Sequence, residues 1–137
     1  REYFQMLTEA LKNARVYQNG VIITSLGPVN NPDMIGEVAD LFLRDDDVTC
    51  SMCYGLSGEK IQISIRTSDE GLDAGKLIHR VVGRKGTGGG HKTYAGGQIP
   101  LAGLAKTASA RLEQQISRKF LKALRVAEHP YTKLIQI

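Results

Sequence analysis

The sequence predicts a single α/β domain in which a mixed sheet of about five strands carries helices packed on it. Segments of alternating polarity recur along the chain, and they separate segments whose apolar residues repeat every three or four positions. Two short turns, Asn19-Gly20 and Ser57-Gly58, are typical of hairpins. At 137 residues, 42% of them hydrophobic, the chain suits one domain over residues 1–137 better than two.

The N-terminal half is predicted to hold two helices and two hairpins. Asn19-Gly20 favours a tight turn because both residues tolerate positive φ. Asn31-Pro32-Asp33 supplies an N-cap, a preset helical φ and an early acid. The expected elements are, in order, a helix over residues 3–14, strands ARVYQ and GVIITSL, a helix from about 33 to 43, and strands VTCSMCYGL and KIQISIRTS.

The C-terminal half is predicted to contain a helix, a glycine-rich loop, a short strand and a long helix. Gly83 ends the first helix. The long helix carries Leu112, Ile116 and Phe120 on one stripe. The expected elements are a helix over residues 72–82, the loop from residue 86, strand GGQIPL and a helix over residues 106–125.

The two cysteines, Cys50 and Cys53, have the C-x-x-C spacing of some zinc and redox sites. They lie in a predicted strand, however, where positions three apart point to opposite faces. No second Cys or Cys/His pair exists to complete a tetrahedral zinc site. We therefore expect buried or half-buried structural thiols.

The stretch GTGGGHKTYAGGQIP, residues 86–100, lies in a basic part of the chain. No acidic residue occurs between Asp73 and Glu113. A solvated basic surface and a binding site for an anion are both consistent with this pattern. The basic residues in the interval are Lys76, Arg80, Arg84, Lys85, Lys92, Lys106 and Arg111.

Alternation in the strand KIQISIRTS separates two sets of side chains. If Ile61, Ile63 and Ile65 face the helices, Ser64 and Arg66 project from the other side near the end of the strand. From there a guanidinium could bind a phosphate or stack on a base. An ordinary exposed arginine is the alternative.

The glycine-rich stretch approaches two nucleotide-binding motifs without matching either. GTGGGHKT has His91 where the P-loop has its second glycine, and the element order around it is helix, loop, strand. The dinucleotide fingerprint fails at the same histidine. What remains is either a tight turn or a nest of backbone N–H groups for an anion, with His91 and Lys92 beside it.

GGGHKTYAGG, preceded by SIRTS and a helix, resembles the GGGH motif of the DHH-associated C-terminal domain of DHH-family phosphoesterases. The resemblance extends from the Asn19-Gly20 hairpin to the last helix. It implies a substrate-binding half in which Arg66 and His91 bind the substrate, while Gly88, Gly89 and Gly90 lend backbone N–H groups. Ser64 and Lys92 belong to the same candidate site.

Two departures from the family pattern concern the ligand. Thr67 stands where the family commonly has serine, and the loop before the glycines is lengthened by residues 84–87. A third departure concerns catalysis. Catalysis in the family resembles two-metal phosphodiester hydrolysis, in which an Asp-His-His triplet helps to hold the metal ions. This sequence has no such triplet, and its histidines lie at 79, 91 and 129. The run Asp45-Asp46-Asp47 fits a solvated turn.

We therefore expect no catalytic or metal-binding residue in this chain, which looks like the C-terminal fragment of a longer metal-dependent phosphoesterase. Mn²⁺ or Mg²⁺ is expected in the missing N-terminal DHH domain of the same polypeptide. The expected ligand is a short oligonucleotide, a linear or cyclic dinucleotide, or another phosphate-rich molecule. The alternative is a non-catalytic nucleic-acid-binding or dimerisation module, as in alanyl-tRNA synthetase C-terminal regions. With no apolar run long enough to span a membrane, we expect a cytoplasmic protein that does not partner with membranes.

Overall fold

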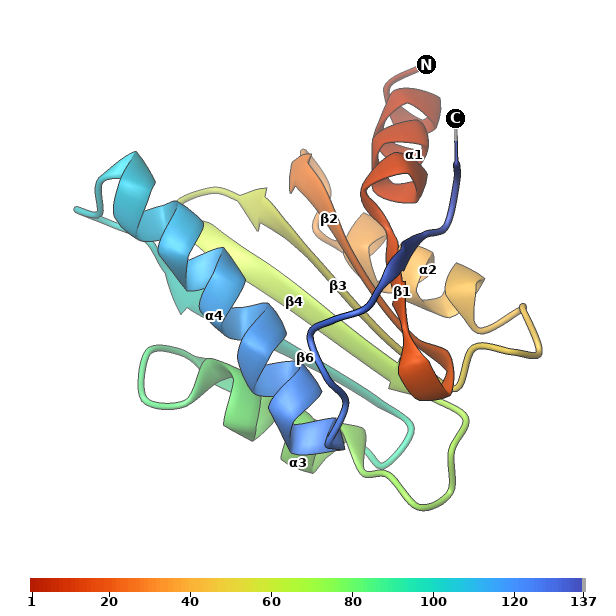
Figure 1. Cartoon of the computed structure of the whole chain (residues 1–137). Helices are drawn as coiled ribbons and strands as arrows, with labels where there is room; N and C mark the ends of the chain where they lie inside the picture. Colours follow the sequence, from red (N-terminus) through yellow and green to blue (C-terminus); the bar gives the residue numbers. More distant parts are fainter. Residues whose placement is uncertain (137) are drawn as a thin grey trace.

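A computed structural model describes residues 1–136 and shows one mixed sheet of seven strands in the order β5-β6-β4-β3-β2-β1-β7 (Figure 1). The strands β2 and β3 are parallel, and all other neighbours are antiparallel. The elements are α1 Glu2–Asn13, β1 Arg15–Tyr17, the 3₁₀ turn η1 Gln18–Gly20, β2 Val21–Pro28, α2 Asp33–Phe42, β3 Cys50–Ser57, β4 Lys60–Thr67, α3 Ala74–Val82, β5 Thr87–Gly90, β6 Tyr94–Pro100, α4 Lys106–Leu124 and β7 Thr132–Lys133.

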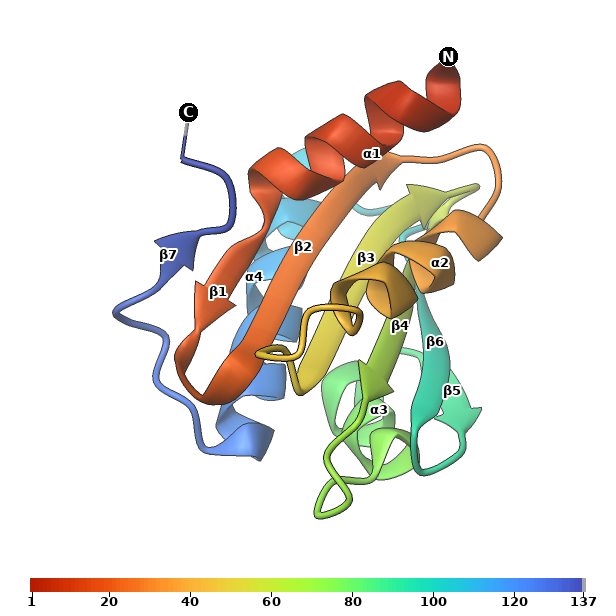
Figure 2. The ribbon, with the colours of Figure 1, turned by 90° about the vertical axis from the view of Figure 1, so that its right-hand side faces the viewer.

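Helices cover both faces of the sheet. Figure 2 shows α1 and α2 on one face, with α3 and α4 behind the other. Each face has its own hydrophobic core, which contains Ile35 and Val38 of α2 on the first and Ile78 of α3 with Phe120 of α4 on the second. The sheet is therefore a middle layer, and a site on it can open only where a helix leaves strands uncovered.

Several expectations about local structure are confirmed. Asn19 and Gly20 both have positive φ, at 63° and 73°, in the turn between β1 and β2. Gly83 ends α3 with a φ of 56°, as expected. The Asn31 side chain accepts a hydrogen bond from the Asp33 N–H just before α2, whose N-cap position is Pro32. The Asp73 side chain, which the sequence analysis did not single out, accepts one from the Lys76 N–H at the start of α3. Local turn and cap chemistry thus sets the element ends as the sequence indicates.

The expectation of about five strands was low by two. Thr87–Gly90, expected as a loop, is the edge strand β5 and pairs with β6. Thr132–Lys133 forms the short strand β7 at the other edge by pairing with β1. Both strands lack an alternating apolar pattern, so only their partners identify them.

Cys50 and Cys53 are both buried and free, and they belong to the two opposite cores. Burial raises the pKa of the Cys50 thiol to about 12 and raises that of Cys53 as well. Both thiols are thus buried and lie on opposite faces of the sheet, as expected. No helix within residues 1–136 is both long and apolar enough to cross a bilayer.

Candidate functional site

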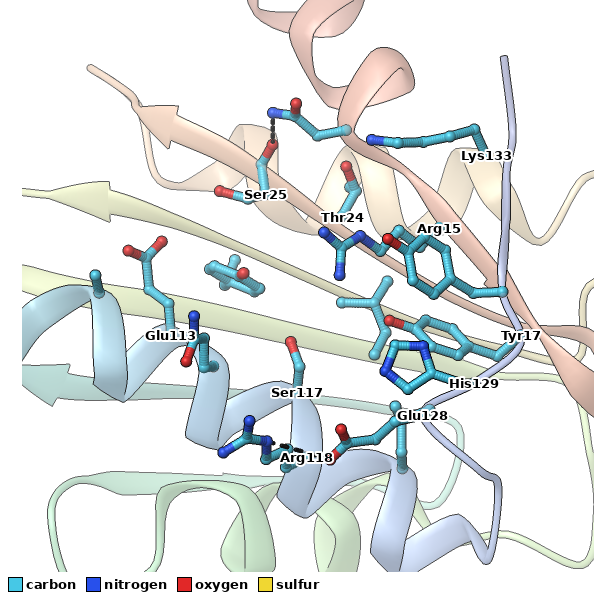
Figure 3. A pocket seen from close by; sticks show the side chains of 17 residues that line it. Arg15, Tyr17, Thr24, Ser25, Glu113, Ser117, Arg118, Glu128, His129 and Lys133 are labelled. Atoms are coloured by element: carbon cyan, nitrogen blue, oxygen red, sulfur yellow. Dashed lines mark hydrogen bonds and ion pairs between the residues drawn. The ribbon is translucent and has the colours of Figure 1, made fainter. Parts of the chain in front are cut away.

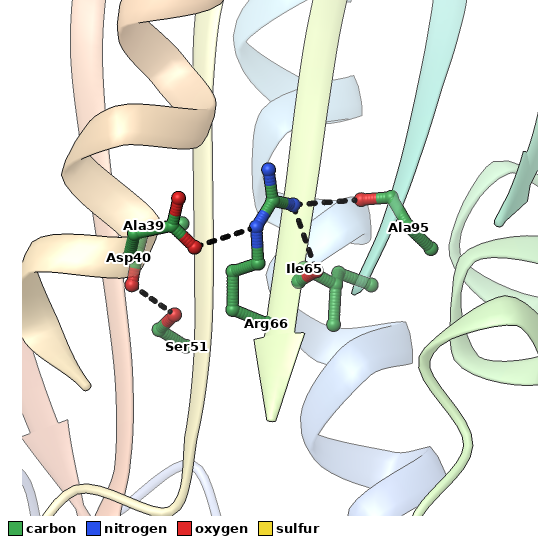
Figure 4. A network of polar contacts seen from close by, with 6 residues as sticks. All are labelled: Ala39, Asp40, Ser51, Ile65, Arg66 and Ala95. Atoms are coloured by element: carbon green, nitrogen blue, oxygen red, sulfur yellow. Dashed lines mark hydrogen bonds and ion pairs between the residues drawn. The ribbon is translucent and has the colours of Figure 1, made fainter. Parts of the chain in front are cut away.

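Arg66 lies on the α2 side of β4, whereas Ile61, Ile63 and Ile65 are buried on the side of α3 and α4. Its Nε donates to the Asp40 carboxylate of α2 at 2.8 Å (Figure 4). One terminal nitrogen, Nη1, donates to the backbone oxygens of Ile65 and Ala95 at 3.1 and 3.4 Å. The guanidinium is thus fixed on three sides, and its Nη2 has no hydrogen-bond acceptor among residues 1–136.

A glycine of α2 makes room for that free nitrogen. A methyl group at Gly36 would lie 2.7 Å from Arg66 Nη2 and 3.6 Å from the Ser64 hydroxyl. Gly36 is also buried in the middle of a helix, where glycine is unfavourable by about 1 kcal/mol relative to alanine. The sequence analysis missed both Gly36 and Asp40, because their link to Arg66 exists only when α2 packs on β4.

Tyr94 connects Arg66 to His91. It stands directly opposite Arg66 in the β4–β6 register. The Arg66 guanidinium carbon lies 5.8 Å from the centre of the Tyr94 ring, and the His91 ring centre lies 4.7 Å from it. The tyrosine is 49% exposed. The structure therefore brings Arg66 and His91 to one place, 25 positions apart in sequence, with a half-exposed aromatic ring between them.

The turn that carries His91 is held by neighbouring backbone. The carbonyls of His91 and Lys92 accept from the N–H groups of Gly75 and Ala74 at the start of α3, at 3.0 and 2.8 Å. The Thr93 carbonyl accepts from Thr67 at the end of β4. His91 itself is exposed. A pinned turn with a solvent-facing imidazole suits ligand contact more than core packing.

The glycines before His91 form an extended strand, which corrects the expectation of a nest. None of Gly88, Gly89 and Gly90 has a positive φ. The His91 N–H donates to Tyr94 O, so antiparallel alternation directs the Gly89 N–H toward β6 and the N–H groups of Gly88 and Gly90 off the sheet edge. Two outward donors, on Gly88 and Gly90, thus remain beside His91.

Most of these glycines have a packing reason. A methyl group at Gly88 or Gly97 would come within 3.0 Å of Ile78 on α3, and one at Gly90 would meet β6 backbone at 2.5 Å. Gly89 differs, because nothing lies within 4 Å of the position its Cβ would take. The bare backbone at Gly89 is therefore not required by the fold.

A groove of about 380 Å³ lies on the α2 face, between α2 and the β5–β6 edge. Of the residues expected to bind substrate, Ser64 and Gly88 line it, and the pair Arg66 and Tyr94 lies two positions along β4 and β6 from the lining pair Ser64 and Gly96. The groove runs from Ser64 toward Gln62 and Gln98, because α2 covers β3 and β4 and leaves β5 and β6 open. Its lining residues are Pro32, Asp33, Gln62, Ile63, Ser64, Thr87, Gly88, Gly96, Gly97 and Gln98.

The cations of the acid-free interval do not gather at this groove. Those of α3, Lys76 and Arg80, belong to a helix on the opposite face, and Lys85 donates to Gln115 of α4 at 2.8 Å. Lys92 alone follows His91 in the turn. The expected one-signed basic field around the glycines is thus divided between two faces of the sheet.

A second cavity of about 450 Å³ lies on the other face, between α4, β2 and the C-terminal segment (Figure 3). Burial raises the pKa of Glu113 and of Tyr54 there. The Arg15 guanidinium lies 4.4 Å from the centre of the Tyr131 ring. None of the residues expected to bind substrate lines this cavity, so the groove on the α2 face is the candidate site.

Comparison with known families identifies most of the chain. Residues 18–118 match the DHHA1 domain. An uncharacterized protein of Methanocaldococcus jannaschii is 30% identical over 133 residues, which are 93% of this chain and 27% of that protein. The chain thus spans about a quarter of that relative's length.

Solved structures share the fold. An exopolyphosphatase-related protein from Bacteroides fragilis superposes with a TM-score of 0.57 at 20% identity, over 90% of this chain and 36% of that one. An exonuclease RecJ bound to manganese gives 0.55 at 18%, over 93% and 28%. The C-Ala domain of Aquifex aeolicus alanyl-tRNA synthetase gives 0.50 at 23%, over 71% and 92%. The chain therefore belongs to the DHHA1 family, the DHH-associated C-terminal domain of the DHH phosphoesterases.

Proposed function

We propose that this domain binds the phosphate of a short oligonucleotide or dinucleotide as the substrate-binding half of a DHH-family phosphoesterase. The observation that carries the proposal is the convergence of Arg66 and His91 on Tyr94, two positions along the strands from the pair Ser64 and Gly96, which lines the groove. Domains of this family occur together with an N-terminal DHH domain in phosphoesterases. That domain is the proposed partner within a longer polypeptide.

In this proposal, one phosphate rests against the free Nη2 of Arg66. Asp40 and two backbone carbonyls hold the guanidinium, so little side-chain entropy is lost when the ligand arrives. His91 donates a second hydrogen bond, and Ser64 offers a hydroxyl from the same strand face as Arg66. The outward N–H groups of Gly88 and Gly90 replace the nest expected from sequence.

Hydrolysis is assigned to the DHH domain. Residues 1–136 contain no group of three or more His, Cys, Asp or Glu side chains that could hold a metal ion. The Mn²⁺ or Mg²⁺ of the proposed activity would therefore be held by the N-terminal domain, and this chain would bind and orient the substrate. We propose the cytoplasm as the place of action.

The experiment is a calorimetric titration of a dinucleotide into the parent chain, Arg66→Ala, His91→Ala and the double variant. Each charge-assisted hydrogen bond is worth about 1.5–3 kcal/mol, so each single variant should bind about tenfold to a hundredfold more weakly. Arg80→Ala, on the opposite face, is the matched control and should bind like the parent. Strictly additive losses, or parent-like affinity in His91→Ala, would contradict a shared phosphate.

A second function, a non-catalytic nucleic-acid-binding module, is favoured by one observation. The chain covers 92% of the C-Ala domain of the synthetase. The same titration with a structured RNA separates the two: affinity for RNA that survives Arg66→Ala, together with no dinucleotide binding, would favour the module.

A further inference from the structure

We propose that the second cavity, between α4, β2 and the C-terminal segment, binds the carboxylate or phosphate group of a small organic molecule through Arg15, Tyr17 and Lys133. This site lies on the opposite face of the sheet from the groove beside α2. It is independent of the proposed function, because none of the residues expected to bind substrate lines the second cavity.

Two cations stand directly opposite each other at this cavity. Arg15 of β1 pairs with Lys133 of β7 in the antiparallel register, and both residues line the cavity. The Leu134 N–H donates to the Ala14 carbonyl, so that neighbouring pair is the hydrogen-bonded one. Arg15 and Lys133 therefore form a non-hydrogen-bonded pair, in which side chains lie closest. Like charges in this position destabilise a sheet, and an anion bound between them would remove the repulsion.

Neither cation has a carboxylate partner within the described part of the chain. Glu113 and Glu128 also line the cavity, but the structure shows no ion pair from either of them to the two cations. Glu128 is paired with Arg118, whose Nε lies 3.2 Å from the Glu128 carboxylate oxygen. Burial raises the pKa of the Glu113 carboxyl and so favours its neutral form. The positive charge of Arg15 and Lys133 is thus available to a ligand.

A buried residue places a hydroxyl group beside these cations. Tyr17 lies two residues from Arg15 on β1 and shares its face, and only 8% of the tyrosine is exposed. The structure shows no hydrogen bond from the Tyr17 hydroxyl to residues 1–136. Among those residues, however, no fully buried side-chain oxygen lacks a partner, so this hydroxyl opens onto the cavity that Tyr17 lines (Figure 3). A donor in so buried a residue calls for water or a ligand to accept from it.

The Arg15 side chain is held in place before a ligand binds. Its guanidinium carbon lies 4.4 Å from the centre of the Tyr131 ring, and the centre of that ring lies 5.7 Å from the centre of the Tyr17 ring. Stacking on an aromatic face restricts a guanidinium without using its N–H groups. One face of the β1–β7 pair thus presents a guanidinium, an ammonium and a phenol as donors. Such a set suits the oxygen atoms of a carboxylate or a phosphate.

The rest of the cavity leaves room for the body of an organic molecule. Its volume is about 450 Å³, which is typical of small-molecule sites. On the α4 side it is lined by Gln114 and Ser117, whose uncharged groups can both donate and accept hydrogen bonds. Two free cations beside neutral polar groups match a molecule with one acidic group better than an extended polyanion.

The test is a titration of the isotope-labelled chain with methyl phosphate and, separately, with acetate, followed by NMR of the backbone amides at constant ionic strength. At least one anion should shift the amide signals of Arg15, Tyr17 and Lys133 along a saturable curve. Lys133→Gln should weaken this binding by about tenfold, because a charge-assisted hydrogen bond is lost. Tyr17→Phe, which removes only the hydroxyl, should weaken it by about fivefold. Lys76→Gln, which replaces an exposed lysine of α3, is the matched control and should bind like the parent.

Saturation with methyl phosphate alone would assign the site to a phosphate group, and saturation with acetate alone to a carboxylate; either supports the proposal. Shifts at these three amides that rise linearly with both anions would overturn it, as would a saturable shift unchanged in both Lys133→Gln and Tyr17→Phe. Because each amide reports its own position, binding of either anion near Arg66 is observed separately and does not affect the result. Thermal melting checks that each variant is folded.

Discussion

Replacement of Gly36 by alanine should separate stability from ligand binding. The new methyl group would lie 2.7 Å from Arg66 Nη2, closer than two non-bonded heavy atoms can stay, so the guanidinium must move away from its place. Its Nη2 is the nitrogen offered to the ligand, and the loss of one charge-assisted hydrogen bond should weaken dinucleotide binding by about tenfold. Glycine-to-alanine exchange inside α2 should at the same time stabilise the helix by about 1 kcal/mol.

The displaced Arg66 also loses its ion pair with Asp40, whose carboxylate is 64% exposed. An exposed pair of this kind contributes about 0–1 kcal/mol, and the hydrogen bonds from Nη1 to the Ile65 and Ala95 carbonyls weaken as well, so these losses offset the gain in helix propensity and the free energy of unfolding should change little. Calorimetric titration and thermal melting measure the two effects. In an Arg66→Ala background, Gly36→Ala should stabilise the fold without a further loss of binding. Weaker binding in that background, or a single variant that binds like the parent, would refute the steric reasoning.

Three further predictions concern other parts of the fold. Gly89→Val should fold like the parent, because no atom lies near the new side chain, and it should bind a dinucleotide more weakly, because that side chain occupies the open face of the strand. Gly88→Val should lower the melting temperature, because its side chain would clash with Ile78 of α3. Equal melting temperatures of the two variants would refute this contrast. Cys50 and Cys53 should resist alkylation in native buffer and react when the chain is unfolded, since burial raises both thiol pKa values; rapid native labelling would contradict this. Desolvation raises the pKa of Glu113 in the folded state, so the Glu113 carboxyl holds its proton more tightly in the folded chain than in the unfolded chain. The contribution of this group to the free energy of unfolding therefore falls as pH rises above about 4.5. Glu113→Gln should therefore be more stable than the parent at pH 7, with a difference in the free energy of unfolding that disappears below that pH.

Most of the sheet could be predicted because its central strands carry their own signals. Ile61, Ile63 and Ile65 alternate with polar residues, and Asn19-Gly20 specifies a turn by its backbone preferences alone. The strand Thr87–Gly90 could not be predicted in this way. It has no alternating side chains, and glycine disfavours strands, so its extended form depends on pairing with β6 and on the close approach of α3.

The site divides along the same line. Arg66 and His91 could be placed near each other from strand alternation and from a family resemblance, but the groups that hold or join them could not. Asp40 and Gly36 lie on a helix that precedes β4 by about 25 positions, and no local pattern indicates which of its residues meets an arginine. Tyr94 had a usable signal, because it lies two residues before Gly96 on a strand and so shares its face.

The glycines of this domain serve two purposes that sequence alone does not separate. Gly88 and Gly97 let α3 approach the back of β5 and β6 within contact distance of Ile78, and this approach fixes the strands from behind. Gly89 has no such neighbour, and it pairs on the opposite face with Gly96, which lines the groove. A strand that packs against a helix on one face and has no side chains on the other is rigid and still leaves its second face accessible. A binding site needs both properties, because the rigid strand keeps the backbone in place and the accessible face lets a ligand pack where a side chain would otherwise lie.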